Sequence, residues 1–165
     1  MVWILGALLT LLAACTPAPS RDPAVVQDVV EYVAKIKQWA TVEEKALKAY
    51  NDVRQSQYVD DDYVIATLAS VMDDVELHLE QIERYRPRTA AVTDVHRRYL
   101  AAWHGLHDAF AATIDAMKRK DYLALSTGTE AMRRARSDLV TVAAALNLLL
   151  KDAGLKEDDP GGAPT

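Results

Sequence analysis

The sequence predicts an all-α protein, folded as an up-down antiparallel four-helix bundle. Three observations support this prediction. No Gly or Pro occurs between Ala24 and Arg86, and only Gly105 and Gly128 occur between Arg88 and Ala153. Helix-favouring residues such as Ala, Leu, Glu and Lys are abundant. Apolar residues recur at spacings of three and four rather than at every second position, which is the pattern of bundled helices.

The first predicted helix begins at Pro23, because Asp22 is a good N-cap residue and Pro is favoured at the first helical position. The second begins near Asp60, where three consecutive aspartates suit a positive helix end, and it stops before Pro87. The alternative is one continuous helix over 24–86 in a long two-helix hairpin. The residues expected to face the core are Val26, Val29, Val33, Ile36, Ala40, Leu47 and Tyr50, then Ile65, Leu68, Met72, Val75, Leu79 and Ile82.

The third predicted helix ends in three basic residues, 118–120, which suit a negative helix end. The fourth begins after Asp121 as N-cap and ends before Gly154. The alternative start is Thr127, where the order Thr-Gly-Thr-Glu matches a capping box. The residues expected to face the core are Val92, Val95, Tyr99, Trp103, Leu106, Phe110, Ile114 and Met117, then Leu125, Met132, Leu139, Val142, Leu146 and Leu150.

The N-terminal residues carry the most specific motif of the chain. An uncharged apolar run over residues 2–12 leads into Leu12-Ala13-Ala14-Cys15. This order resembles the lipobox of bacterial lipoproteins. The resemblance implies that a peptidase removes the signal peptide 1–14 and that a diacylglycerol with palmitate-type chains is attached to Cys15. The apolar run is too short to span a bilayer, which fits a removed signal.

The lipobox and the helix pattern together divide the chain into four parts. These are the signal peptide 1–14, the lipidated cysteine and tether 15–22, the bundle 23–154 and a disordered tail 155–165. The resemblance to lipoproteins implies an extracytoplasmic protein anchored to a cell membrane. Thr16, rather than Asp, follows the cysteine, which implies the periplasmic face of the outer membrane rather than the inner membrane.

Composition narrows the chemistry that we expect of the bundle. Cys15 is the only cysteine among the 165 residues, so acylation leaves no thiol for a disulfide, a thiolate metal site or a cysteine nucleophile. The net charge of −5 disfavours nucleic acid as a partner. No nucleophile-elbow motif surrounds the helical serines Ser70, Ser126 and Ser137. We therefore do not expect the protein to be an enzyme.

Four histidines lie in the second and third predicted helices. His78 and His96 fall at a similar level on either side of the turn near Pro87, which makes them weak candidate metal ligands. His104 and His107 share one flank of the third helix. A stable site needs three or four ligands, so we expect no metal. The CxxCH motif of covalently bound haem is absent, and we expect no cofactor.

Three arginines lie around the turn between the second and third helices. In an up-down bundle this turn is at the same end as the start of the first helix, and acyl chains on Cys15 bring that end close to the lipid surface. We hypothesise that Arg84, Arg86 and Arg88 face anionic head groups, each contributing about 1 kcal/mol. The alternative is that these arginines only complement helix ends.

Seven further side chains are assigned from their positions on the helices. Glu43 lies at the edge of a core stripe and is expected to reach solvent or a neighbouring arginine. Trp39 and Tyr63 flank the stripes and are candidate exposed contact residues, whereas Trp103 is expected in the core. Arg133, with its basic neighbours at 134 and 136, is expected on a solvated face.

These observations favour a lipid-anchored cell-envelope bundle with a non-catalytic binding, scaffold or interaction role. Its expected partners are membrane lipid through Cys15, and an envelope protein or a second copy of the chain. The alternative is a sensor-like or carrier bundle that holds a metal, haem or a small apolar ligand between its helices.

Overall fold

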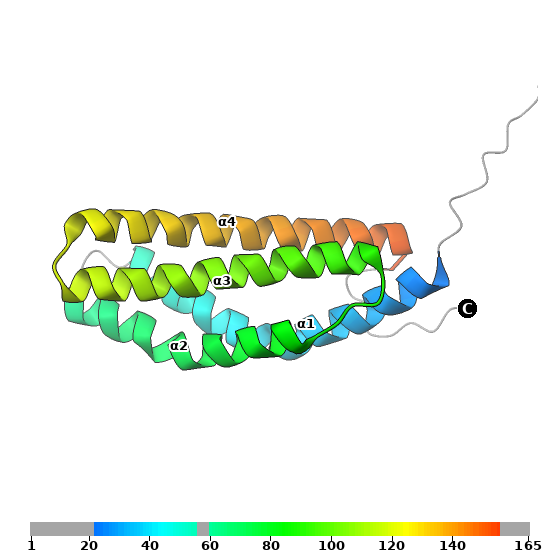
Figure 1. Ribbon diagram of the computed structural model, residues 1–165, viewed down its shortest axis with the longest axis horizontal. Helices are drawn as coiled ribbons and strands as arrows, with labels where there is room; N and C mark the ends of the chain where they lie inside the picture. The colour runs from blue at the N-terminus through cyan, green and yellow to red at the C-terminus, as the bar shows by residue number, and fades with distance from the viewer. Residues whose placement is uncertain (1–21, 56–59, 156–165) are drawn as a thin grey trace, which may run out of the picture.

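The computed structural model describes residues 22–55 and 60–155, and these residues form four antiparallel α-helices. The helices are α1 (Pro23–Gln55), α2 (Asp61–Arg84), α3 (Ala90–Lys118) and α4 (Tyr122–Ala153). They run along one common long axis, and α1 begins at the end where α2 turns into α3 and where α4 finishes (Figure 1). The four-helix bundle is thereby confirmed. The two-helix hairpin is wrong, because α1 and α2 are separate helices.

The helix ends follow the capping residues of the sequence. Asp22 accepts a hydrogen bond from the amide two residues on at 2.9 Å, and Asp60 accepts one from the amide three residues on at 2.6 Å. Asp121 does the same for α4 at 3.0 Å. Gly154 ends α4 with a φ of 72°, a left-handed conformation that glycine adopts without strain. The alternative start of α4 at Thr127 is wrong, because its hydroxyl donates to the carbonyl of the preceding helical turn.

The predicted core stripe is accurate for α3 and wrong in part for α1. All eight residues predicted for α3 are buried. On α1 the buried face is rotated toward Tyr32, Trp39 and Ala46, which are spaced by seven residues and form a second row of contacts. Trp39 is only 6% exposed, so its prediction as an exposed contact residue is wrong, whereas Tyr63 is 39% exposed. Aromatic rings on α1 fill the space between α2 and α3 that aliphatic residues were expected to fill.

Helices α3 and α4 pack together most extensively, and small residues lie between them. A Cβ atom added to Gly128 of α4 would lie 2.6 Å from Oγ1 of Thr113 and 3.3 Å from two backbone atoms of the same residue on α3. At Gly105 of α3 the nearest atom to an added Cβ is the Cβ of Ala135 on α4, at 3.6 Å. The contact at Gly128 therefore leaves no room for a methyl group, whereas the contact at Gly105 does leave room for one.

The hydrophobic core lies within the four helices themselves. Its buried apolar residues run from Val29 on α1 to Ala153 on α4, and Leu155 packs against it from the chain beyond. A chain that begins at Thr16 therefore keeps every contact that the structure describes. Within residues 22–55 and 60–155, no helix is both long enough and apolar enough to cross a bilayer.

Candidate functional site

One buried carboxylate closes the end of the bundle where α1 begins. Asp28 of α1 is only 1% exposed. Its Oδ2 accepts hydrogen bonds from the amide of Arg88 at 3.0 Å and from the amide and hydroxyl of Thr89, both at 2.7 Å. Thr89 is the N-cap residue of α3, so a side chain from α1 satisfies the donors at the start of another helix. This contact fixes the first helix to the turn between α2 and α3.

The three candidate membrane-facing arginines are exposed, and of the three only Arg88 contacts the Asp28 carboxylate among the interactions of the described residues. Arg88 pairs with Glu31 of α1 at 2.6 Å, and Arg84 pairs with Glu80 at 2.9 Å. Arg86 donates to two backbone carbonyls at the end of α2. All three lie at the end where α1 begins, as the topology predicts. The partners of Arg84 and Arg86 are on their own helix or its end, and Arg88 joins the turn to α1.

A chain of three polar side chains crosses the middle of the bundle. The Tyr99 hydroxyl on α3 donates to Oε1 of Glu43 on α1, and its oxygen lies 3.3 Å from Nε2 of His78 on α2. Because Tyr99 gives its one proton to Glu43, Nε2 of His78 carries the hydrogen and donates to the Tyr99 oxygen. Nδ1 of His78 is buried and has no hydrogen-bond partner within the described residues. Glu43 is half-buried, and its carboxylate is held by Tyr99 rather than by an arginine.

Burial shifts the pKa of each member of this chain. It lowers the pKa of His78 to about 4 and keeps the imidazole neutral at neutral pH. It raises the pKa of Glu43, and the hydrogen bond from Tyr99 offsets part of that rise. It also raises the pKa of the Tyr99 hydroxyl far above its usual range, with a further contribution from the Glu43 carboxylate.

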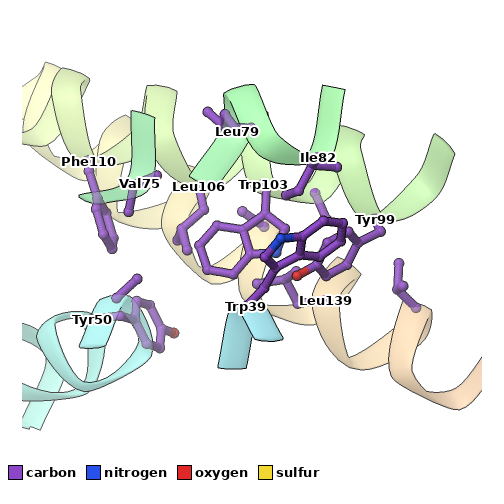
Figure 2. Close-up of a cluster of buried hydrophobic side chains, with 14 of the residues drawn as sticks. Trp39, Tyr50, Val75, Leu79, Ile82, Tyr99, Trp103, Leu106, Phe110 and Leu139 are labelled. Atoms are coloured by element: carbon purple, nitrogen blue, oxygen red, sulfur yellow. The ribbon is translucent and has the colours of Figure 1, made fainter. Parts of the chain in front are cut away.

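Aromatic rings enclose the His78 imidazole. Trp103 meets it edge to face with ring centroids 4.5 Å apart, and Trp39 meets it in the same manner at 5.8 Å. Trp39 also stacks on Tyr99, with centroids 6.1 Å apart and planes inclined by 12°. Figure 2 shows Trp39, Tyr99 and Trp103 grouped together in the centre of the core. The polar chain is therefore packed as part of the core.

The other histidine singled out by the sequence lies in a different aromatic environment. His96 contacts Tyr32 and Tyr85, with ring centroids 5.6 and 5.5 Å away. Burial and the nearby Arg86 charge lower its pKa. Across the two described ranges, no three His, Cys, Asp or Glu side chains are grouped so that they can hold a metal ion. The structure does not add a third ligand to His78 and His96.

His104 and His107 lie where α3 meets α2, and His104 is exposed whereas His107 is half-buried. His104 Nε2 lies 3.0 Å from the Glu83 carboxylate, and His107 Nε2 lies 3.5 Å from that of Glu76. Each of these two imidazoles thus faces an acidic residue of α2.

An apolar pocket lies at the opposite end of the bundle. Its volume is about 340 Å³, and residues from all four helices line it. Its wall is made of Tyr50, Val53, Val64, Met117, Leu125 and Met132. The two methionines are core residues, as the helix pattern predicts, and their side chains are flexible enough to adapt to a ligand. The pocket is the strongest candidate for a binding site.

The rim of this pocket carries three charged side chains. Arg133 binds Glu130 through two hydrogen bonds of 2.8 and 2.6 Å, so these two charges neutralise each other. Arg54, from the last turn of α1, also lines the pocket and is exposed. It forms no ion pair with any other described side chain. Arg133 is exposed, as predicted, but it takes part in the rim.

Comparison of the chain with models of protein families, with curated proteins and with solved structures found no match. The fold and the candidate site define the class on their own: an all-α four-helix bundle with an apolar pocket at one end. The lipobox of Cys15 lies outside the described residues.

The depressed pKa of His78 predicts a loss of stability in mild acid. The unfolded chain binds a proton at His78 near pH 6.5, whereas the folded protein binds it only near pH 4. Stability is therefore complete above pH 6.5 and falls as the pH drops toward 4. At about 1.4 kcal/mol per pKa unit, the free energy of unfolding should fall by about 2 kcal/mol between pH 7 and pH 5. The lowered pKa of His96 acts in the same direction, and the raised pKa of Glu43 opposes both.

Urea unfolding at pH 7 and pH 5 measures this fall. His78→Gln removes the ionising group and should lose most of the pH dependence, while His104→Gln at the surface should keep it. An equal fall in the wild type and in His78→Gln would show that another group carries the effect.

Proposed function

We propose that this protein is a lipid-anchored cell-envelope bundle with a non-catalytic binding role. In this proposal Cys15 holds the chain at the periplasmic face of the outer membrane, and the bundle presents a binding site to the periplasm. The single observation that supports the binding role is the apolar pocket formed where the ends of all four helices meet.

The position of the pocket fits a tethered protein. The tether would join the bundle at Pro23, and Tyr50 in the pocket wall lies 27 residues further along the same helix. At 1.5 Å per residue this is a distance of roughly 40 Å. The anchored end would then carry the contact of Asp28 with Arg88 and Thr89. Arg84, Arg86 and Arg88 would lie beside the lipid surface, while the pocket would open far from it.

The pocket also favours one form of the carrier alternative over the others. Its wall offers aliphatic, aromatic and methionine side chains, whereas the histidines suited to a metal lie elsewhere in the bundle. A small apolar ligand held between helix ends therefore fits this protein better than a metal ion does.

Acylation of Cys15 tests the anchored part of the proposal. The full chain and its Cys15→Ser variant would be expressed in a diderm bacterium supplied with an alkyne analogue of palmitate. We expect label and outer-membrane fractionation for the wild type, and neither for the variant. A wild-type chain that is cut elsewhere and recovered unlabelled in the soluble fraction would contradict the proposal.

A further inference from the structure

The geometry points to a specific ligand class for the pocket at the end of the bundle: an amphiphile with one apolar chain and a single negative charge. A fatty acid and a lysophospholipid with an anionic head group both have this chemistry. The inference rests on the binding role proposed above and names the ligand class for the same site.

The apolar part of the ligand follows from the wall of the pocket. The volume of about 340 Å³ falls within the range of small-molecule sites, which is about 300–1,000 Å³. Val64, Met117 and Met132 reach it from three different helices and are themselves buried. Filling this space with an apolar chain removes the chain from water and completes the packing at the end of the core. Leu125 of α4 also lines the pocket and is half-buried.

The charge of the ligand follows from the rim. Glu130 and Arg133 neutralise each other through two hydrogen bonds, so the charge that remains among the lining residues is that of Arg54. A guanidinium group offers paired donors that match the oxygens of a carboxylate or a phosphate. A head group with one negative charge would meet Arg54 at the rim while its chain occupies the wall.

Calorimetric titration of the chain 16–165, which keeps every described contact, tests the charge and the chain separately. The probes are decanoate, decanol and decyltrimethylammonium, which share one chain length and differ in charge. We expect decanoate to bind with a stoichiometry of one and at least tenfold more tightly than decanol, and the cation to bind more weakly still. A parallel titration uses lysophosphatidylglycerol. Tighter binding of lysophosphatidylglycerol than of decanoate would indicate a phospholipid as the ligand, and the reverse order would indicate a free fatty acid.

Two pairs of variants place the ligand within the fold. Leu125→Trp fills the pocket and should abolish decanoate binding, while Leu146→Trp, at a half-buried position of α4 outside the pocket, should not. Arg54→Gln should weaken decanoate about tenfold and leave decanol unchanged, while Arg134→Gln should leave both unchanged. Circular dichroism of each variant confirms that it is folded.

Any one of three outcomes would overturn the inference. The first is a folded wild-type chain that does not bind decanoate or lysophosphatidylglycerol at millimolar concentration. The second is equal affinity for all three probes, and the third is decanoate binding that survives Leu125→Trp. Because the chain 16–165 lacks Cys15, these results do not depend on acylation. A failure of the palmitate experiment would therefore refute the anchor and leave the titration valid.

Discussion

Replacing Asp28 with alanine should lower the free energy of unfolding by about 3 kcal/mol. The carboxylate accepts three hydrogen bonds from Arg88 and Thr89 at the start of α3, and it is buried. Alanine leaves those part-buried donors without an acceptor. An unsatisfied buried donor lowers the free energy of unfolding by about 1–3 kcal/mol, and the loss of a helix cap lowers it by about 0.5–2 kcal/mol. The same substitution also removes the link between α1 and the turn from α2 to α3.

Asp28→Asn is the matched control for this change. It keeps one side-chain oxygen as an acceptor and should cost about 1 kcal/mol, because the hydrogen bonds lose their charged acceptor. Urea unfolding gives both free energies, and hydrogen exchange at the Thr89 amide reports the contact directly. Equal stability of Asp28→Ala and the wild type would show that water replaces the carboxylate at no cost, and that this end of the bundle is not held as described.

Two glycine variants of identical composition should differ in stability by about 3 kcal/mol. Gly105→Ala meets only the Cβ of Ala135 at 3.6 Å, so it should gain the helix preference of alanine over glycine, about 1 kcal/mol. Gly128→Ala would place a methyl group 2.6 Å from the Thr113 hydroxyl and 3.3 Å from the α3 backbone. Overpacking at a buried position costs about 1–3 kcal/mol, and we expect the upper end of that range for Gly128→Ala. This cost exceeds the gain in helix preference that the alanine brings.

Thermal and urea unfolding of the two variants measure this difference. Thr113→Ala combined with Gly128→Ala removes the hydroxyl from the closest contact and should recover part of the lost stability, since neighbouring substitutions are not additive. If Gly128→Ala is as stable as Gly105→Ala, then α3 and α4 separate at little cost and their close packing does not limit stability.

The helices could be predicted because local residues determine where they begin and end. Asp60 and Asp121 cap the helices that follow them, and Gly154 supplies the left-handed residue that ends α4. Spacing along the sequence also identified the large apolar residues that α3 buries, although not its buried alanines, His96 and Thr113. Helix α3 packs against each of the other three helices. Its buried face is therefore wide and carries many apolar residues, which makes the face easy to identify from their spacing.

The missed features depend on residues far apart in the sequence. Asp28 and Thr89 are separated by 61 positions, and nothing near Asp28 shows that it caps another helix. From the sequence alone, Glu43 has the pattern of a surface residue, and only the structure shows that Tyr99 of α3 holds its carboxylate. Trp39 flanks the predicted stripe of its helix, and only the packing of α1 against α2 and α3 shows that it is buried.

The pocket could not be predicted from the sequence for a similar reason. Its wall residues have ordinary core positions, and the space between them exists only because four helix ends meet without filling it. The pairing of Arg133 with Glu130 and the position of Arg54 then determine the charge at its rim.

The most direct test of the binding role is a two-dimensional NMR titration of the chain 16–165, labelled with nitrogen-15, with decanoate. We expect amide shifts concentrated around the pocket residues Arg54, Val64, Leu125 and Met132. The amides of Arg84, Arg86 and Arg88, at the opposite end, should not shift. Shifts confined to the end with the three arginines, or no shifts in a well-folded spectrum, would contradict the binding role.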